Sequence, residues 1–141
     1  MQASQNLERM PAMTRTERPA RLLLVDDDDD IRALFAAALH RAGYQPRVAS
    51  SGQQALDQAG ELVPDLVISD VSMPGLSGLD VCRALKAEPR TAGTAVLLVS
   101  AMSSEQDREA GLQAGADDYL TKPIRPSLLL ERVRSLLGAL A

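Results

Sequence analysis

The sequence predicts an α/β protein in which one parallel sheet is covered by helices on both faces. Short aliphatic runs alternate along the chain with segments whose apolar residues recur every three or four positions, the pattern of β-α units. The aliphatic runs are continuous, as expected for parallel strands that are buried on both faces. With 141 residues, 45% of them hydrophobic, the chain is long enough to form the core of one such domain.

Five segments are predicted to be strands because each is short and is built mainly from aliphatic or β-branched residues. They are, in chain order, LLLV at 22–25, a shorter segment at 45–49, DLVIS at 65–69, AVLLVS at 95–100 and DYLT at 118–121. The first, third and fourth are the most continuously aliphatic, so they are expected to be covered on both faces.

Five helices are predicted between and after these strands. The first ends near Gly43, and its apolar residues follow the i, i+3, i+4 spacing of an amphipathic helix: Ile31, Leu34, Phe35, Ala38 and Leu39. The next three are expected over 51–59, 79–87 and 105–114. Serines cap the first of these three, and Gly115 is a stop signal after the last. Pro126 is expected to start the final helix, whose apolar face comprises Leu128, Leu129, Val133, Leu136 and Leu137.

Composition and charge exclude several classes of protein. A net charge of −4 argues against binding nucleic acid through a broad basic face, because phosphate affinity depends on Lys and Arg. No apolar run is long enough to span a bilayer, and the first residues lack the apolar stretch of a signal peptide. The single cysteine, Cys82, has no internal disulfide partner. We therefore expect a cytoplasmic domain that binds neither nucleic acid nor membrane directly.

Residues 1–20 are expected to form a flexible leader, because they contain two prolines and no sustained apolar period. A short helical turn is expected there around Asn6–Met10. The folded domain is expected to occupy residues 21–141, where the aliphatic runs occur. Whether the chain is a stand-alone protein or part of a longer one stays open.

Polar side chains stand at the carboxyl ends of four predicted strands: Asp26 and Asp27, Asp70, Ser100, and Lys122. In an open parallel sheet these ends share the edge where the functional crevice lies. Three carboxylates would repel one another there unless a cation lay among them, and hard oxygen ligands suit Mg²⁺. A lysine and a hydroxyl would stabilise a phosphoryl group while a carboxylate attacks phosphorus. The strand ends therefore predict a Mg²⁺-assisted phosphoryl acceptor.

Four segments carry a family resemblance through their order and spacing: LLLVDDDDDIR, DLVISDVSMPGLSGLD, VLLVSA and AGADDYLTKP. Together they resemble the receiver domain of two-component response regulators, over residues 21–141. The resemblance implies a flavodoxin-like (CheY-like) three-layer α/β/α sandwich with five parallel strands in the order 2-1-3-4-5 and five helices. It also implies phosphorelay signalling rather than an enzyme that turns over a substrate.

The resemblance assigns distinct roles to the acidic residues. Asp70 matches the phosphoacceptor, and Asp26 and Asp27 match the pair that holds Mg²⁺, Asp27 directly and Asp26 through water. The backbone carbonyl of Ser72 would be a further ligand. A register shifted by one, with Asp27 and Asp28 as the metal-binding pair, stays open.

The resemblance also identifies the parts of a switch. Ser100 would turn its hydroxyl towards the phosphoryl group, and Lys122 would pair with a phosphoryl oxygen. The Tyr119 ring would move inward as Ser100 moves. The Lys122–Pro123 bond resembles the cis peptide of the family.

The remaining aspartates of the block, 28–30, are expected in the turn and first helical turn, where carboxylates cap backbone N–H groups. An EF-hand calcium loop does not fit, because its sixth position would be Ile31 rather than Gly and its twelfth Ala37 rather than Glu. Asp65 and Asp80 are expected to be surface or capping residues.

Two side chains of reactive types are expected to have structural roles. Cys82 shares a helical face with Leu79 and Leu85, so it is expected to lie in the core. His40, the single histidine, lies near the end of the first predicted helix. It is expected to face solvent and not to act as a phosphodonor.

The resemblance implies that Asp70 takes its phosphoryl group from a sensor histidine kinase or a histidine phosphotransfer protein. The new state would be read at the face formed by the fourth predicted helix, the fifth strand and the last helix. A downstream protein target, a detached effector domain, or a second copy in a phosphorylation-dependent homodimer would bind that face. Ser72 and Met102 occupy positions that tune dephosphorylation in the family.

Two other functions fit parts of the pattern. A phosphatase of the haloacid-dehalogenase type also uses a strand-end aspartate, but it needs a second Asp two residues later, where this chain has Ser72. A degenerate receiver would only bind a partner, but here no acidic or lysine member of the site is missing. Phosphorylation in vitro would exclude the degenerate receiver.

Overall fold

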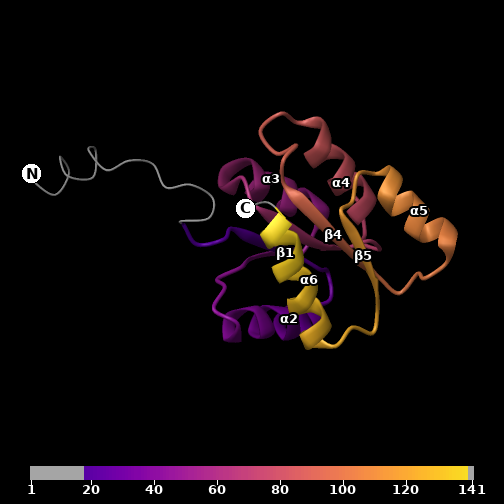
Figure 1. Ribbon diagram of the computed structural model, residues 1–141. Helices are drawn as coiled ribbons and strands as arrows, with labels where there is room; N and C mark the ends of the chain where they lie inside the picture. The colour runs from indigo at the N-terminus through magenta and orange to yellow at the C-terminus, as the bar shows by residue number, and fades with distance from the viewer. Residues whose placement is uncertain (1–17, 140–141) are drawn as a thin grey trace, which may run out of the picture.

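The structure, a computed structural model, describes residues 18–139, so the turn expected around Asn6–Met10 lies outside the described residues. The strands are β1 Leu22–Val25, β2 Arg47–Ala49, β3 Leu66–Asp70, β4 Ala95–Ser100 and β5 Asp118–Thr121. The helices are α2 Asp29–Arg41, α3 Gly52–Leu62, α4 Gly78–Ala87, α5 Glu105–Gln113 and α6 Pro126–Ala139. Strand and helix alternate from β1 to α6, as predicted (Figure 1).

The five strands form one parallel sheet in the order β2-β1-β3-β4-β5. This order confirms the predicted flavodoxin-like topology. The direction in which strands are added reverses between β1 and β3, and ligand sites of such sheets lie over the carboxyl ends of the strands at that point. The fold therefore places the functional crevice where Asp26, Asp27 and Asp70 stand.

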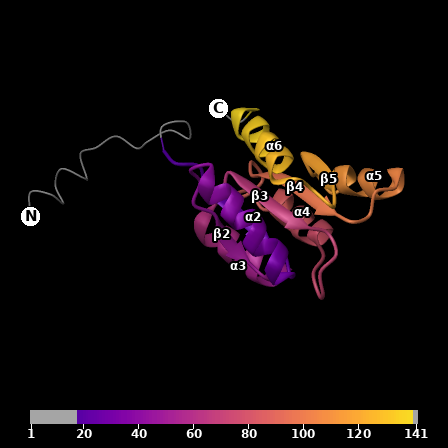
Figure 2. The same ribbon diagram turned by 90° about the horizontal axis from the view of Figure 1, so that it is seen from below.

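Helices cover both faces of the sheet (Figures 1 and 2). On one face α2 and α6 pack against the strands through Phe35, Leu39, Leu129 and Val133. On the other face the strands meet α3 and α4, which contribute Ala55, Ala59, Val81, Cys82 and Leu85. The strand residues alternate between these two clusters, and both sides are apolar. Burial on both faces explains why the strand sequences are continuously aliphatic.

Side chains cap the helix starts that the sequence predicts. Asp28 is the N-cap residue of α2 and accepts hydrogen bonds from the backbone N–H groups of Asp30 and Ile31, at 2.9 and 3.1 Å. The predicted serine cap of α3 is present. Asp80 forms a capping box with Ser77 at the start of α4. Part of the aspartate block therefore serves the helix, as predicted.

The prediction that Asp65 is a surface or capping residue is wrong, because Asp65 is 1% exposed. Its carboxylate accepts two hydrogen bonds from the Arg18 guanidinium, at 2.8 and 2.9 Å. It also accepts one from the backbone N–H of Arg21 at 2.9 Å. These bonds compensate the burial of the charge. They also hold Arg18, which the sequence assigns to the leader, against the start of β1.

Cys82 and His40 lie where the sequence predicts. Cys82 is fully buried, and its thiol donates to the carbonyl oxygen of Ala114 over 3.3 Å. His40 is exposed on α2. Within residues 18–139 no helix has the length and apolar character that crossing a membrane requires.

Candidate functional site

Three carboxylates converge at the carboxyl edge of the sheet. Asp26 and Asp27 follow β1, and Asp70 is the last residue of β3, which lies beside β1. One carboxylate oxygen of each residue lies within 4.8 Å of the other two. Asp26 and Asp70 are 2% and 8% exposed, whereas Asp27 faces solvent. The cluster is therefore a buried acidic pair with one solvent-facing member.

The aspartate block is divided between this cluster and the start of α2. Asp28 caps the helix, whereas Asp26 turns inward and accepts a hydrogen bond from the Asp28 N–H at Oδ1, over 2.9 Å. The backbone carbonyl of Asp26 accepts a second bond from Arg32 Nη1 at 2.8 Å. These bonds fix the turn after β1. The geometry therefore favours Asp26 and Asp27 as the acidic pair over the register with Asp27 and Asp28.

Lys122 reaches the acidic cluster from the loop after β5. Its Nζ lies 3.1 Å from Asp26 Oδ2 and 3.4 Å from Asp70 Oδ1. Burial acts to lower the pKa of Lys122, but its hydrogen bond to Asp26 and the charge of Asp70 raise that pKa above its ordinary value. The Lys122–Pro123 peptide bond is cis, as expected. One ammonium group thus serves two buried carboxylates.

The balance of charge leaves Asp70 in an acidic environment. Burial raises the pKa of Asp70, Lys122 lowers it, and Asp26 and Asp27 raise it again, so that the net pKa lies above its ordinary value. Three carboxylates facing a single ammonium are an arrangement that an added cation would stabilise. Such a cation would also favour the ionised, nucleophilic form of Asp70.

The donor set of this cluster fits Mg²⁺. Carboxylate oxygens are hard ligands, and Mg²⁺ is usually held by one or two carboxylates together with water and phosphate oxygens. Asp26, Asp27 and Asp70 are the side chains that could hold it. Ser72, whose backbone carbonyl is a predicted ligand, is exposed in the loop that follows β3. Its role stays a prediction.

Ser100 and Tyr119 are both bonded to the backbone of Met102. Ser100, the last residue of β4, is 1% exposed, and its Oγ accepts a hydrogen bond from the Met102 N–H at 3.0 Å. Tyr119 donates its hydroxyl to the Met102 carbonyl oxygen at 2.7 Å, and its ring is buried. The two predicted switch residues therefore hold the same residue of the β4–α5 loop, and the Tyr119 ring points inward.

Two glycines that the sequence does not single out shape the site. A Cβ at Gly111, in α5, would lie 2.9 Å from Cδ2 of Tyr119, so glycine leaves room for the inward ring. A Cβ at Gly78, the first residue of α4, would collide with the backbone carbonyl oxygen of Asp70. The Gly78 N–H also donates to the Val71 carbonyl at 2.8 Å. A glycine at the start of a helix or inside it is the sequence signal that points to such close approaches.

Comparison with known proteins identifies the family. The profile of the response regulator receiver domain matches residues 22–134. The chain is 40% identical over 115 residues to the DNA-binding response regulator MtrA of Mycolicibacterium smegmatis, a match that covers 82% of this chain and 49% of MtrA. It is 44% identical over 117 residues to the response regulator PleD of Caulobacter vibrioides, covering 83% of this chain and 26% of PleD.

The structural comparison agrees with the sequence comparison. The crystallised chemotaxis protein CheY4 of Vibrio cholerae superimposes with a TM-score of 0.81 at 31% identity, over 84% of this chain and 99% of CheY4. The chain therefore belongs to the response regulator receiver domain family, whose members are signalling domains. It spans about half the length of the first curated relatives that it matches.

Proposed function

We propose that residues 21–141 form a receiver unit that accepts a phosphoryl group on Asp70, in the cytoplasm, as one step of a two-component phosphorelay. The observation that carries this proposal is the position of Lys122 Nζ, 3.4 Å from Asp70 Oδ1 and 3.1 Å from Asp26 Oδ2. A phosphoryl group on Asp70 would bring anionic oxygens within reach of this ammonium. The ammonium is thus placed to stabilise the charge that the transfer brings into the site.

In the transfer, a carboxylate oxygen of Asp70 attacks the phosphorus of a phosphohistidine on the donor protein. The O–P bond forms as the P–N bond breaks, the bonding pair stays on the imidazole nitrogen, and that nitrogen takes up a proton. Lys122 stabilises the phosphoryl oxygens throughout. The product is an aspartyl phosphate. Attack of water on its phosphorus later releases phosphate, at a rate that we expect Ser72 and Met102 to tune.

Asp26, Asp27 and Asp70, with the backbone carbonyl of Ser72, would hold Mg²⁺. When bound, Mg²⁺ supplies positive charge that offsets the repulsion between these carboxylates and the incoming phosphoryl group. The exposed Asp27 carboxylate suits direct binding. The Asp26 carboxylate bonds to Lys122 and to a backbone N–H, which favours contact through water.

Ser100 and Tyr119 would transmit the phosphorylated state to the surface. The Ser100 hydroxyl turns to the phosphoryl group and releases the Met102 N–H, and Tyr119 then repacks with the loop. The phosphoryl group would make different contacts in the two conformations of the loop. This difference would shift the equilibrium between them. The face that changes comprises α5, β5 and α6. This face suits a conformational change, because α5 is weakly anchored: Gly111 is the only residue of α5 that is buried.

A sensor histidine kinase or a histidine phosphotransfer protein would deliver the phosphoryl group. A groove of about 350 Å³ borders the site, and Lys122 lines it together with apolar side chains of α2 and of the loops after β4 and β5. Leu34, in this groove, is 53% exposed. A donor that covers Leu34 would bring its histidine to the edge of the site. The output face would bind a downstream target, a detached effector domain, or a second copy of the chain.

Turnover of a small phosphorylated substrate has less support. A phosphatase with an aspartate nucleophile of the haloacid-dehalogenase type needs a second Asp two residues after the first, and Ser72 stands at that position. A hydroxyl side chain lacks the acidity to protonate a leaving group at neutral pH. We therefore propose a phosphoacceptor and not a turnover enzyme.

The acceptor residue can be identified chemically. Borohydride reduces an aspartyl phosphate to homoserine, and tryptic peptide mass spectrometry then shows which residue has changed. After incubation with acetyl phosphate and Mg²⁺, we expect homoserine at position 70. Homoserine at Asp26 or Asp27 instead would contradict the assignment of the acceptor.

A further inference from the structure

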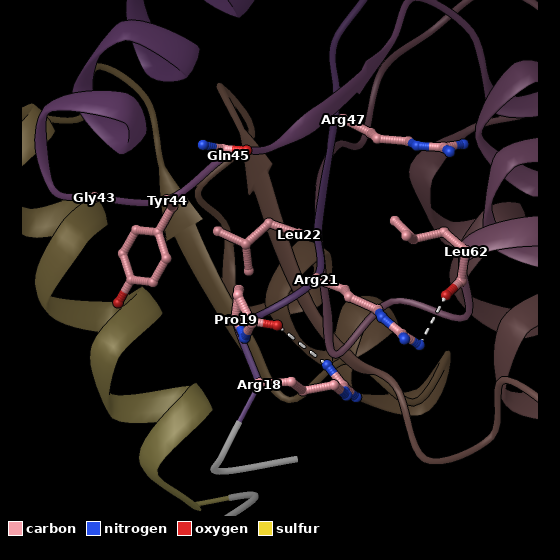
Figure 3. A pocket seen from close by; sticks show the side chains of 10 residues that line it. Arg18, Pro19, Arg21, Leu22, Gly43, Tyr44, Gln45, Arg47 and Leu62 are labelled. Carbon is pink, nitrogen blue, oxygen red and sulfur yellow. Dashed lines mark hydrogen bonds between the residues drawn. The ribbon is translucent and has the colours of Figure 1, made fainter. Parts of the chain in front are cut away.

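A second cavity lies at the amino edge of the sheet, the edge opposite to Asp70. Its volume is about 670 Å³, within the range of small-molecule sites, roughly 300 to 1,000 Å³. It lies between the segment that leads into β1, the loop from α2 to β2, and the end of α3 (Figure 3). We name it the amino-edge pocket and define it by Arg18, Arg21, Leu22, Tyr44, Arg47 and Leu62.

One wall of the amino-edge pocket is held in place by a buried ion pair. Arg18 forms two hydrogen bonds to Asp65, and Asp65 also accepts the backbone N–H of Arg21. Asp65 is 1% exposed, so this wall is anchored to the core of the domain. The pocket is therefore a preformed feature and not a gap beside a loose segment.

The described part of the pocket lining carries more positive than negative charge. Among residues 18–139, three arginines and no acidic residue line the pocket. The charge of Asp65 balances that of Arg18. Arg47 Nη1 lies 3.6 Å from Glu61 Oε2, but at least half of each of these two side chains is exposed, and exposed ion pairs are weak. The Arg21 guanidinium reaches the Leu62 carbonyl at 3.5 Å and, within residues 18–139, forms no ion pair with a carboxylate. This excess of positive charge is local, because the chain as a whole has a net charge of −4.

The pocket also offers a surface for a flat ring. Figure 3 shows Tyr44 and Gln45 on one side of the view, Arg21 and Arg47 on the other, and Leu22 between them. Aromatic faces stack on ligand rings, and guanidinium groups bind phosphate through paired N–H donors. The Tyr44 ring and the two guanidinium groups therefore stand at opposite ends of the lining, and a ligand that contacts both must extend past Leu22.

We propose that the amino-edge pocket binds a nucleoside phosphate, with the ring against Tyr44 and the phosphate between Arg21 and Arg47. This proposal does not depend on phosphorylation of Asp70, because the two sites occupy opposite edges of the sheet. A ligand here contacts the segment before β1 and the β2 edge together, and so it stabilises the position of that segment.

ADP is a suitable probe, and ¹H–¹⁵N correlation spectra of the full chain, with EDTA present to remove Mg²⁺, give the readout. We expect saturable shifts of the backbone amides of residues 18, 20–22, 43–45, 47 and 62, since Pro19 and Pro46 have no N–H. Pyrophosphate and adenosine, titrated separately, should each bind more than tenfold more weakly than ADP, because each makes only one of the two contacts. The double variant Arg21→Gln/Arg47→Gln should lose more than tenfold in affinity, and Tyr44→Leu should weaken ADP while leaving pyrophosphate unchanged.

The double variant Arg90→Gln/Arg134→Gln is the matched control, since it removes the same two charges from exposed positions outside the pocket. It should bind ADP as the wild type does. Three results would overturn the proposal: no saturable shift at the lining residues, equal affinity in the double variant with an otherwise unchanged spectrum, or pyrophosphate binding as tightly as ADP. The last result would reduce the pocket to a simple anion site.

Discussion

Tyr119 donates its hydroxyl proton to the backbone carbonyl oxygen of Met102, over 2.7 Å. The N–H of the same residue donates to Ser100 Oγ. Because both groups of one loop residue are engaged, a change at Ser100 alters the loop that holds the Tyr119 ring. The link between the proposed phosphorylation site and the proposed output face is thus a pair of hydrogen bonds that can be removed one at a time.

Removing the Tyr119 hydroxyl should loosen the β4–α5 loop. In Tyr119→Phe the Met102 carbonyl loses its partner, which should cost about 1 kcal/mol of unfolding free energy. Amide hydrogen exchange at residues 101–105 should become faster while the core strands keep their protection. Tyr44→Phe, at the far edge of the sheet, is the control and should leave this loop unchanged. Equal exchange in Tyr119→Phe and wild type would show that the bond does not order the loop.

Gly111 should tolerate no side chain while Tyr119 points inward. The Cβ of Gly111→Ala would lie 2.9 Å from the Tyr119 ring, so we expect a loss of about 1 to 3 kcal/mol in chemical denaturation. Gly60→Ala, in α3, is the matched control because a Cβ there meets nothing within 4 Å. It should stabilise the protein by roughly 0.5 to 1 kcal/mol through helix propensity. Stabilisation of both variants would contradict the tight contact.

Stability should fall at alkaline pH because of Cys82. Burial raises the pKa of the Cys82 thiol from 9.0 to about 11. The native state therefore holds the proton more tightly than the unfolded chain, and the unfolding free energy decreases as pH rises between these two values. The contribution is on the order of 2 kcal/mol. The difference in stability between wild type and Cys82→Ala should shrink across this window, and a constant difference would show that the thiol does not titrate there.

Mg²⁺ should stabilise the folded chain through the carboxylate cluster. At a concentration 100 times its Kd, a ligand that binds only the native state adds about 2.7 kcal/mol. The melting temperature should therefore rise when Mg²⁺ is added, and Asp27→Asn should abolish this rise. Asp30→Asn is the matched control, because it removes an exposed acid of the same block that lies outside the cluster. Loss of the Mg²⁺ effect in both variants would mean that the whole block attracts the ion without a defined site.

The sequence predicts the sheet and the acidic site well because both depend on local pattern. Each central strand is a continuous aliphatic run, and Asp26 and Asp70 stand where such runs stop. The ends of elements are less predictable. β2 begins at Arg47 and not at position 45, since its pairing with β1 begins only at Leu23 and Arg47. α3 runs past its predicted end at position 59 to Leu62.

Contacts between distant segments leave no trace in a local pattern. Arg18 and Asp65 are 47 positions apart, and their pairing depends on how the segment before β1 crosses the start of β3. The bond from Tyr119 to Met102 uses a backbone carbonyl, which any residue at that position would provide. Neither interaction could be predicted from residue types, although both determine how the site and its opposite edge are built.

The most direct test of the phosphoacceptor role is intact-mass measurement after incubation with acetyl phosphate, with and without Mg²⁺. We expect the wild type to gain one phosphoryl group only when Mg²⁺ is present, and Asp70→Asn to gain none. The acidic control is Asp80→Asn, which should still be modified, because the Asp80 carboxylate serves to cap α4. Asp65→Asn is less suitable, because it would disturb the fold. No gain in a folded wild-type sample, or an equal gain in Asp70→Asn, would contradict the assignment of Asp70 as the phosphoacceptor.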